Sequence, residues 1–267
     1  MRKLGAIAAA VALAVLLAGC GGSKKSSVAP KPVSGDLIVA AAAKSSKAGS
    51  VEADFKLSGA GVSGSGSGVF NTGSSRSGQL KLKVNVRGMS VPLDSVITGN
   101  VLYLRSPIFS QLGLSRDKWV KLDLAQLGEQ QGIDLNSLAS TSPTPASALE
   151  YLRGSGDVRE VGSESVGGVD TTHYKVKVDL RRAAARSTGS ERQSLNRVIQ
   201  ASGVKKLPID VWVDGKGYIR RVQYAQKAGA SKPVQITMNL HDYGAPVTVK
   251  PPPASDTVDF MKTLGNR

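Results

Sequence analysis

The sequence is poor in cysteine and in aromatic residues: Cys20 is its single cysteine among 267 residues, and 4% of the residues are aromatic. One thiol cannot close a disulfide within the chain, so the folded part must depend on its hydrophobic core. The scarcity of rings disfavours nucleic acid as a partner, because base stacking needs aromatic side chains. A small disulfide-stabilised scaffold is therefore excluded, and nucleic-acid binding is not expected.

Histidine is equally rare, with His173 and His241 at polar positions of their segments. Neither has a second histidine at metal-ligand spacing, and no GxSxG motif indicates a nucleophilic serine. Both histidines are interpreted as surface residues on the wet face of a strand. Glu52 and Asp54 point the same way along an alternating segment, which is also how an ordinary solvated face looks. We therefore expect no enzyme activity, no metal site and no cofactor.

The segment Gly59–Gly64, GAGVSG, fits the GxGxxG pattern of dinucleotide-binding loops. That loop must open into a helix, whose N-terminus binds the pyrophosphate. Here the alternating SGSGVFNT follows, which indicates a strand. We interpret the glycine–serine run as a loose hairpin turn.

The first nineteen residues have the pattern of an export signal. Arg2 and Lys3 precede the uncharged, mostly apolar run from Ala6 to Ala18. Residues 17–20, LAGC, fit the lipobox of bacterial lipoproteins, in which the cysteine thiol is alkylated by lipid. An ordinary signal peptide is the alternative, and a membrane-spanning helix is disfavoured because it needs about 20 apolar residues. We predict a signal over 1–19 and a lipid anchor on Cys20 at the outer face of the cytoplasmic membrane.

Residues 21–35, GGSKKSSVAPKPVSG, have almost no apolar surface with which to offset the entropy of ordering. With Cys20 they are predicted to form a flexible, lipid-anchored tether over 20–35, followed by one domain over 36–267. The chain is basic, with a formal net charge of +15. This excess favours either affinity for anionic lipid headgroups and acidic polymers or simply a well-solvated surface.

Several segments of the body alternate apolar and polar residues, the pattern of strands with one wet and one apolar face. The segments are VEADFKLSG (51–59), QLKLKVNVRG (79–88), LPIDVWVDG (207–215) and VQITMNLHD (234–242). Turn signals at 98–100, 167–168 and 214–217 connect neighbouring strands so tightly that the strands must be antiparallel.

Helical patterns are few. They cover an alanine-rich first helix at 36–49, a helix in TPASALEYLRG (144–154) and one in GSERQSLNRVIQASG (189–203). We expect the apolar sides of these helices to pack against the apolar face of a long sheet and shield it from water. The sequence therefore predicts an α+β fold with one large curved antiparallel sheet and helices on its inner side.

Three stretches give the chain a family resemblance: WVKLDL (119–124), residues 151–180 with GVDTTHYKV, and LPIDVWVDGKGYIRRVQY (207–224). Together with the lipobox they resemble the actinobacterial lipoprotein family of LppX, LprA, LprF and LprG. That family is related in fold to LolA, LolB and RseB. The resemblance implies a half-open antiparallel barrel whose concave apolar face is covered by helices and holds acyl chains.

The resemblance also implies a function: binding, and carriage through the envelope, of a lipid or glycolipid by a monomeric lipoprotein. The candidate residues that line the cavity are the apolar members of three alternating strands: Leu80, Leu82, Val84, Val86, Ile209, Val211, Val213, Ile236, Met238 and Leu240. A packed core without a cavity is the alternative for these residues. A regulatory lipoprotein of the RseB kind, acting through a membrane-protein partner, is the alternative function.

Overall fold

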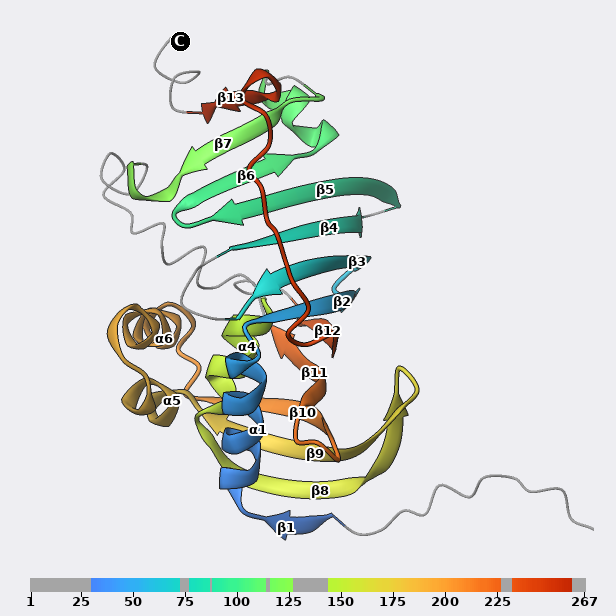
Figure 1. Ribbon diagram of the computed structural model, residues 1–267, viewed down its shortest axis with the longest axis vertical. Helices are drawn as coiled ribbons and strands as arrows, with labels where there is room; N and C mark the ends of the chain where they lie inside the picture. The colour runs from blue at the N-terminus through green and yellow to red at the C-terminus, as the bar shows by residue number, and fades with distance from the viewer. Residues whose placement is uncertain are drawn as a thin grey trace, which may run out of the picture.

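A computed structural model of the protein (Figure 1) describes the body of the chain. The described residues are 30–72, 77–86, 88–113, 116–126, 144–226 and 232–260. The predicted signal, Cys20 and residues 21–29 of the predicted tether lie outside them. Within the described ranges, no helix is long and apolar enough to cross a membrane.

All strands within the described residues belong to one 13-stranded sheet with the order β1-β8-β9-β10-β11-β12-β2-β3-β4-β5-β6-β7-β13. The strands are β1 (Lys31–Val33), β2 (Ser50–Gly59), β3 (Val62–Asn71), β4 (Ser77–Val86), β5 (Met89–Thr98), β6 (Val101–Arg105), β7 (Trp119–Asp123), β8 (Ser155–Val166), β9 (Val169–Asp179), β10 (Lys206–Asp214), β11 (Ile219–Gln226), β12 (Val234–His241) and β13 (Thr257–Asp259). Only β13 pairs in parallel, with β7. The sheet is curved and unclosed, with β1 and β13 at its edges, so the predicted α+β class and single large sheet are confirmed.

The helices are α1 (Gly35–Lys47), α4 (Pro145–Leu152), α5 (Leu180–Arg186) and α6 (Gly189–Ser202), with 3-10 turns η1 (Pro107–Leu112) and η2 (Ala254–Asp256). Helix α1 begins after Ser34, whose hydroxyl accepts a hydrogen bond from the Asp36 amide at 3.2 Å. Gly49, with a φ of 85°, follows its end and turns the chain into β2. The predicted helices are thus present where the patterns place them.

The hairpin between β2 and β3 turns at Ala60 and Gly61, whose φ angles are 54° and 75°. Two residues with positive φ match the strand twist that a two-residue hairpin requires. Gly59–Gly64 is therefore the tip of a hairpin. The alternating SGSGVFNT that follows belongs mostly to β3 (Val62–Asn71), as predicted, and the turn itself is confined to Ala60 and Gly61.

The folded body begins earlier than the predicted boundary at residue 36. Lys31–Val33 form β1 and pair with β8, with Val33 opposite Val158. An edge strand is held by backbone hydrogen bonds on one side, so it needs little apolar sequence and tolerates Pro32. The last residues assigned to the tether are part of the sheet.

We call the face of the sheet that carries Val51, Val211 and Met238 the inner face, and the opposite one the outer face. Helices α1 and α4 lie against the inner face, close to each other and to β3, β8 and β11. The side chains that they and α5 and α6 add to the core include Ile38, Ala42, Leu149, Leu152, Leu180 and Leu195. The main core therefore lies between these helices and one part of the sheet, from β8 to β2.

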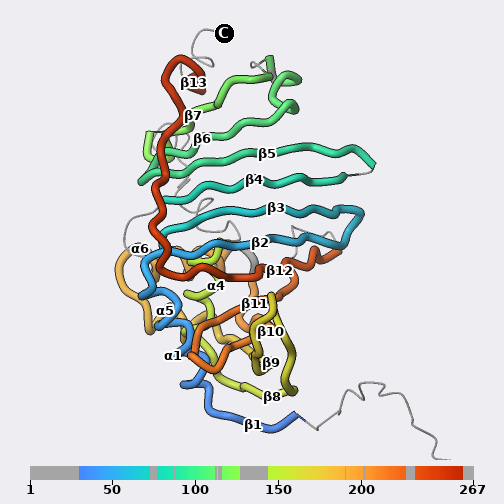
Figure 2. Tube along the Cα trace, turned by 45° about the vertical axis from the view of Figure 1, so that its right-hand side comes forward, coloured from blue at the N-terminus to red at the C-terminus, as the bar shows by residue number. Residues whose placement is uncertain are grey.

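The chain between β12 and β13 crosses strands β2 to β7, as the red segment of Figures 1 and 2 shows. It is tied at one end by the Gly244 amide, which donates to the Ser50 carbonyl at 3.0 Å. At the other end Lys118 Nζ donates to the Ser255 carbonyl at 2.6 Å. This segment links the two ends of the second half of the sheet.

Candidate functional site: an apolar face on strands β4 to β7

The inner face continues beyond the main core onto strands β4 to β7. The strand register pairs Leu82 with Leu93 and Val84 with Val91, and Leu102 with Leu122. The half-buried apolar residues on this part of the face are Leu80, Leu82, Val84, Val91, Leu93, Ile97, Leu102, Leu104 and Leu122. Ser95 is the single polar side chain among the inner-face positions of β4, β5 and β6. We call this surface the apolar platform.

Charged side chains of the same strands lie on the outer face. Lys81 and Lys83 alternate with the leucines of β4 and are exposed. On the outer face Asp94 forms an ion pair with Arg105, with 2.7 Å between Oδ2 and Nη2. Strict alternation thus separates a charged outer surface from an apolar inner one, as the period of two requires.

The strand register brings all the predicted lining residues onto the inner face, but the residues differ in burial. Those on β10 and β12 are Ile209, Val211, Val213, Ile236, Met238 and Leu240, and all are buried members of the main core. Those on β4 are Leu80, Leu82 and Val84, which are half-buried, and Val86, which is exposed. The apolar face is therefore fully buried on β10 and β12 and less covered on β4, where Leu80 and Leu82 still pack against the main core. That these residues line a cavity stays a prediction.

Glycines of β3 lie between the packed part and the platform. Gly64, Gly66 and Gly68 face inward, each opposite an apolar residue of β4. A methyl group at Gly66 would overlap the carbonyl oxygen of Lys81 and lie 2.8 Å from Leu82 Cα. Glycine thus permits a close approach of β3 and β4 that no other residue allows. The signal for this feature was glycine at every second position, a spacing typical of one face of a strand.

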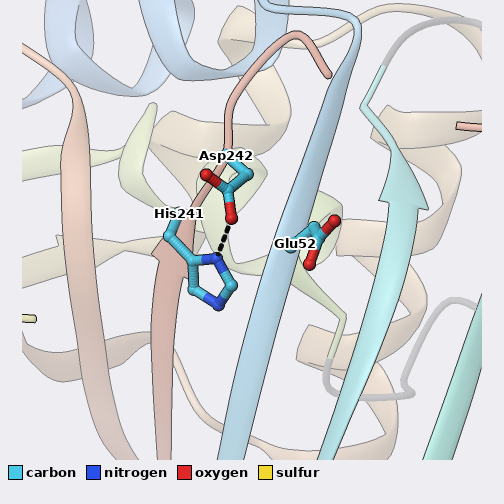
Figure 3. Close-up of side chains that lie close together, drawn as sticks. All are labelled: Glu52, His241 and Asp242. Carbon is cyan, nitrogen blue, oxygen red and sulfur yellow. Dashed lines mark hydrogen bonds and ion pairs between the residues drawn. The ribbon is translucent and has the colours of Figure 1, made fainter. Parts of the chain in front are cut away.

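Figure 3 shows a group of polar side chains on the outer face, formed by Glu52, His241 and Asp242. His241 Nδ1 and Asp242 Oδ2 are 2.7 Å apart, and His241 Nε2 is 3.4 Å from Asp54 Oδ2. Each of these three residues offers one atom that could bind a metal ion, and the three atoms lie within 4.8 Å of one another. The His241 side chain is 38% exposed, as predicted for a wet face. Exposed groups of this kind are common without a metal, so we assign this one to surface ion pairing.

His173 lies on the outer face, as predicted, but its neighbours cover most of the ring. Its ring stacks on Trp212 with centroids 4.1 Å apart and an angle of 5°, and its Nε2 lies 2.7 Å from Asp210 Oδ1. Trp212 Nε1 donates to Glu164 at 2.8 Å. These contacts leave the His173 side chain 16% exposed. The alternating pattern shows which face a residue occupies, but not what its neighbours on that face cover.

Comparison with known proteins gives relatives of two kinds. No family model matches the sequence. An uncharacterized 31.2 kDa protein of Streptomyces griseus is 32% identical over 153 residues, 55% of this chain and 49% of that protein. A protein of Streptomyces coelicolor, named as a lipoprotein, is 28% identical over 153 residues, 56% of this chain and 44% of its own length. The matches thus span about half the length of these relatives.

Among solved structures, LprF from Mycobacterium bovis matches 83% of this chain and 99% of its own, with a TM-score of 0.50 and 14% identity. LppX from Mycobacterium tuberculosis covers 80% of this chain and all of its own, with a TM-score of 0.45 and 14% identity. The chain has the α+β fold of LprF, an open and strongly curved sheet with few helices. The predicted resemblance is thereby confirmed for the fold of LprF.

Proposed function

We propose that this protein is an extracytoplasmic lipoprotein, anchored through Cys20, that binds the acyl chains of a lipid or glycolipid on the apolar platform. The observation that carries the proposal is the pairing of Leu82 with Leu93 and of Val84 with Val91 on a face without charged side chains. These residues are half-buried, whereas the same face is fully buried in the main core.

The energetics favour an acyl ligand at this place. Soluble proteins rarely expose a contiguous apolar patch larger than a few hundred Å², and larger ones mark binding sites. Each methylene group transferred from water contributes about 0.8 kcal/mol, so a dozen of them outweigh the cost of immobilising the ligand. Leucine and valine side chains, with few rings, offer a smooth surface that suits flexible acyl chains.

The proposed binding surface is narrower than the set of residues predicted from the sequence. The residues on β10 and β12 are buried in the main core together with side chains of the helices. In the proposal they support the sheet, and the ligand lies over β4, β5 and β6. The name of the Streptomyces coelicolor relative and the LprF fold support a lipoprotein of this class.

Native mass spectrometry of the full chain, purified from its native host by gentle solubilisation, tests the proposal. We expect a bound lipid with two or more acyl chains that solvent extraction removes. Protein recovered empty, together with a stoichiometric membrane-protein partner, would instead support the regulatory alternative. Protein that fails to bind short fluorescent lipids at both low and high salt would also contradict lipid binding.

A further inference from the structure

Exposed hydrophobic side chains gather at one end of the sheet. The large hydrophobic residues that are exposed among the described ranges are Leu37, Val86, Met89, Ile108 and Val204. Three of the five, Val86, Met89 and Ile108, lie at this end, and the exposed fraction is 66% for Met89 and 45% for Ile108. Val86 and Met89 lie directly opposite each other where β4 and β5 meet, so they extend the inner face of the apolar platform to its rim.

Ile108 belongs to the same end. Its 3-10 turn, η1, follows β6 and lies beside β5, because the Ser106 hydroxyl donates to the Pro92 carbonyl at 2.6 Å. In Figures 1 and 2 the β2–β3 turn, the meeting of β4 with β5, and η1 are all on the right-hand side. We call this end, formed by residues 55–67, 81–86, 88–93 and 106–113, the hairpin end.

Within these bounds the charged side chains of the hairpin end are positive, and the nearest acidic residues, Asp54 and Asp94, lie one residue outside them. Its residues include no aspartate or glutamate, whereas Lys56, Lys81 and Lys83 are exposed on it. Lys56 and Lys83 flank Ser65 in the register of the outer face. Lys232 adds to them, because the following Pro233 abuts Gly59 at the end of β2. Exposed apolar side chains bordered by lysines are the pattern of segments that insert shallowly into anionic membranes.

From this placement we propose that the hairpin end docks on an anionic lipid bilayer, with Met89 and Ile108 inserted among the acyl chains and the lysines against the headgroups. The partner is a membrane surface, because side chains as dispersed as these form no pocket for a protein segment, and the charge matches phosphate headgroups. This rests on the proposed function in one respect: docking there would bring the rim of the platform to the bilayer, so that a lipid could pass between them.

Fluorescence of a polarity-sensitive dye tests the docking. The dye is placed in the full chain at Met89→Cys or, as control, at Val204→Cys, both in a Cys20→Ser background. Val204 is the matched control because it is also an exposed hydrophobic residue, outside the hairpin end. Both variants share one N-terminus, so attachment through that segment affects both alike. We expect vesicles of phosphatidylcholine with phosphatidylglycerol to shift the dye at 89 to the blue and leave the dye at 204 unchanged.

Two further variants separate the apolar and the electrostatic contributions to vesicle binding. Ile108→Asp should abolish the shift at 89, since it places a charge at the inserted rim. Lys83→Glu should weaken vesicle binding on the order of fivefold or more when phosphatidylglycerol is present, and change little on phosphatidylcholine alone. Equal responses of the dye at 89 and 204, or no response at 89, would overturn the proposal.

The failure of docking is distinguishable from the failure of lipid binding. Ile108 lies outside the platform, so Ile108→Asp should still bind a single dispersed lipid in native mass spectrometry. Lipid binding without a dye shift would retain the proposed function and reject docking. A dye shift at 89 in protein that binds no lipid would do the reverse.

Discussion

Leu82 on β4 lies directly opposite Leu93 on β5, and both are half-buried on the same inner face that buries Val211 completely. One continuous apolar face thus has two environments. From β8 to β2 it is buried in the main core together with side chains of the helices. Beyond the glycines of β3 it is mostly half-buried, although Val120 of β7 is buried. The account of function depends on this difference.

The difference predicts opposite effects of enlarging two valines. Val211→Trp should lower the free energy of unfolding by about 1–3 kcal/mol, because the core has no room for a larger side chain. Val84→Trp should leave the melting midpoint nearly unchanged and weaken lipid uptake. Thermal melting and a fluorescent-lipid titration measure the two effects. A large loss of stability in both variants would indicate that β4 is also solidly packed.

Gly66 is predicted to be irreplaceable for steric reasons. Gly66→Ala should destabilise the protein by roughly 1–3 kcal/mol, because its methyl group would overlap the Lys81 carbonyl oxygen and force β3 and β4 apart. Ser65→Ala, at the neighbouring exposed position, is the matched control and should be close to neutral. Denaturant unfolding curves compare them, and equal stability of the two variants would show that the sheet relaxes freely there.

Asp214 should make the free energy of unfolding fall when the pH is lowered into the acidic range. Its carboxylate accepts hydrogen bonds from the Tyr218 amide at 2.9 Å and from Arg220 Nε at 2.7 Å. Burial by itself raises the pKa of Asp214, but these bonds outweigh it and hold that pKa below its usual range. The stabilisation is complete above the ordinary aspartate pKa of about 3.9 and is lost as pH falls through the lower folded value.

Asp214→Asn should therefore lower the free energy of unfolding at neutral pH by about 1–3 kcal/mol and flatten its decline on acidification. Asp170→Asn, at an exposed position of β9, serves as control and should keep the decline of the parent protein. Urea titrations from neutral pH to about pH 2 measure this. An unchanged acid profile in the Asp214 variant would contradict the role of this carboxylate.

The lipid anchor remains a prediction from the residues LAGC at 17–20, which lie outside the described ranges. Mass spectrometry of the N-terminal peptide from membrane-purified protein should show a lipid-sized addition on Cys20. Cys20→Ala should lose that addition and release the body from the membrane. Recovery of an unmodified Cys20 in membrane-purified protein would exclude the anchor.

Local patterns predicted the elements that are long and periodic. Alternation in 79–88 and 234–242 gave β4 and β12, and capping and periodicity gave α1 and α6. The short β1 was missed because pairing at a sheet edge depends on a distant strand. Alternation in SGSGVFNT also predicted β3, although glycine is usually depleted in strands.

The shared face of the candidate residues was predicted, whereas their lining of a cavity stays a prediction. Alternation correctly placed Val84 and Val211 on one apolar side, since the register of a single sheet connects them. It could not show that Val211 is fully buried and Val84 only half-buried, because periodicity describes one strand and burial depends on the tertiary structure. The hairpin end was hidden for the same reason, since Met89 and Ile108 come together only in the fold.

The most direct measurement of the central claim is photochemical cross-linking with a two-chain lipid that carries a photoreactive group in one acyl chain. After irradiation of the full chain, peptide mass spectrometry identifies the labelled residues. The account predicts labels on the platform, within residues 80–104, and none on β10 or β12. Labels confined to the outer face, or to residues such as Val211 and Met238 in the main core, would contradict it.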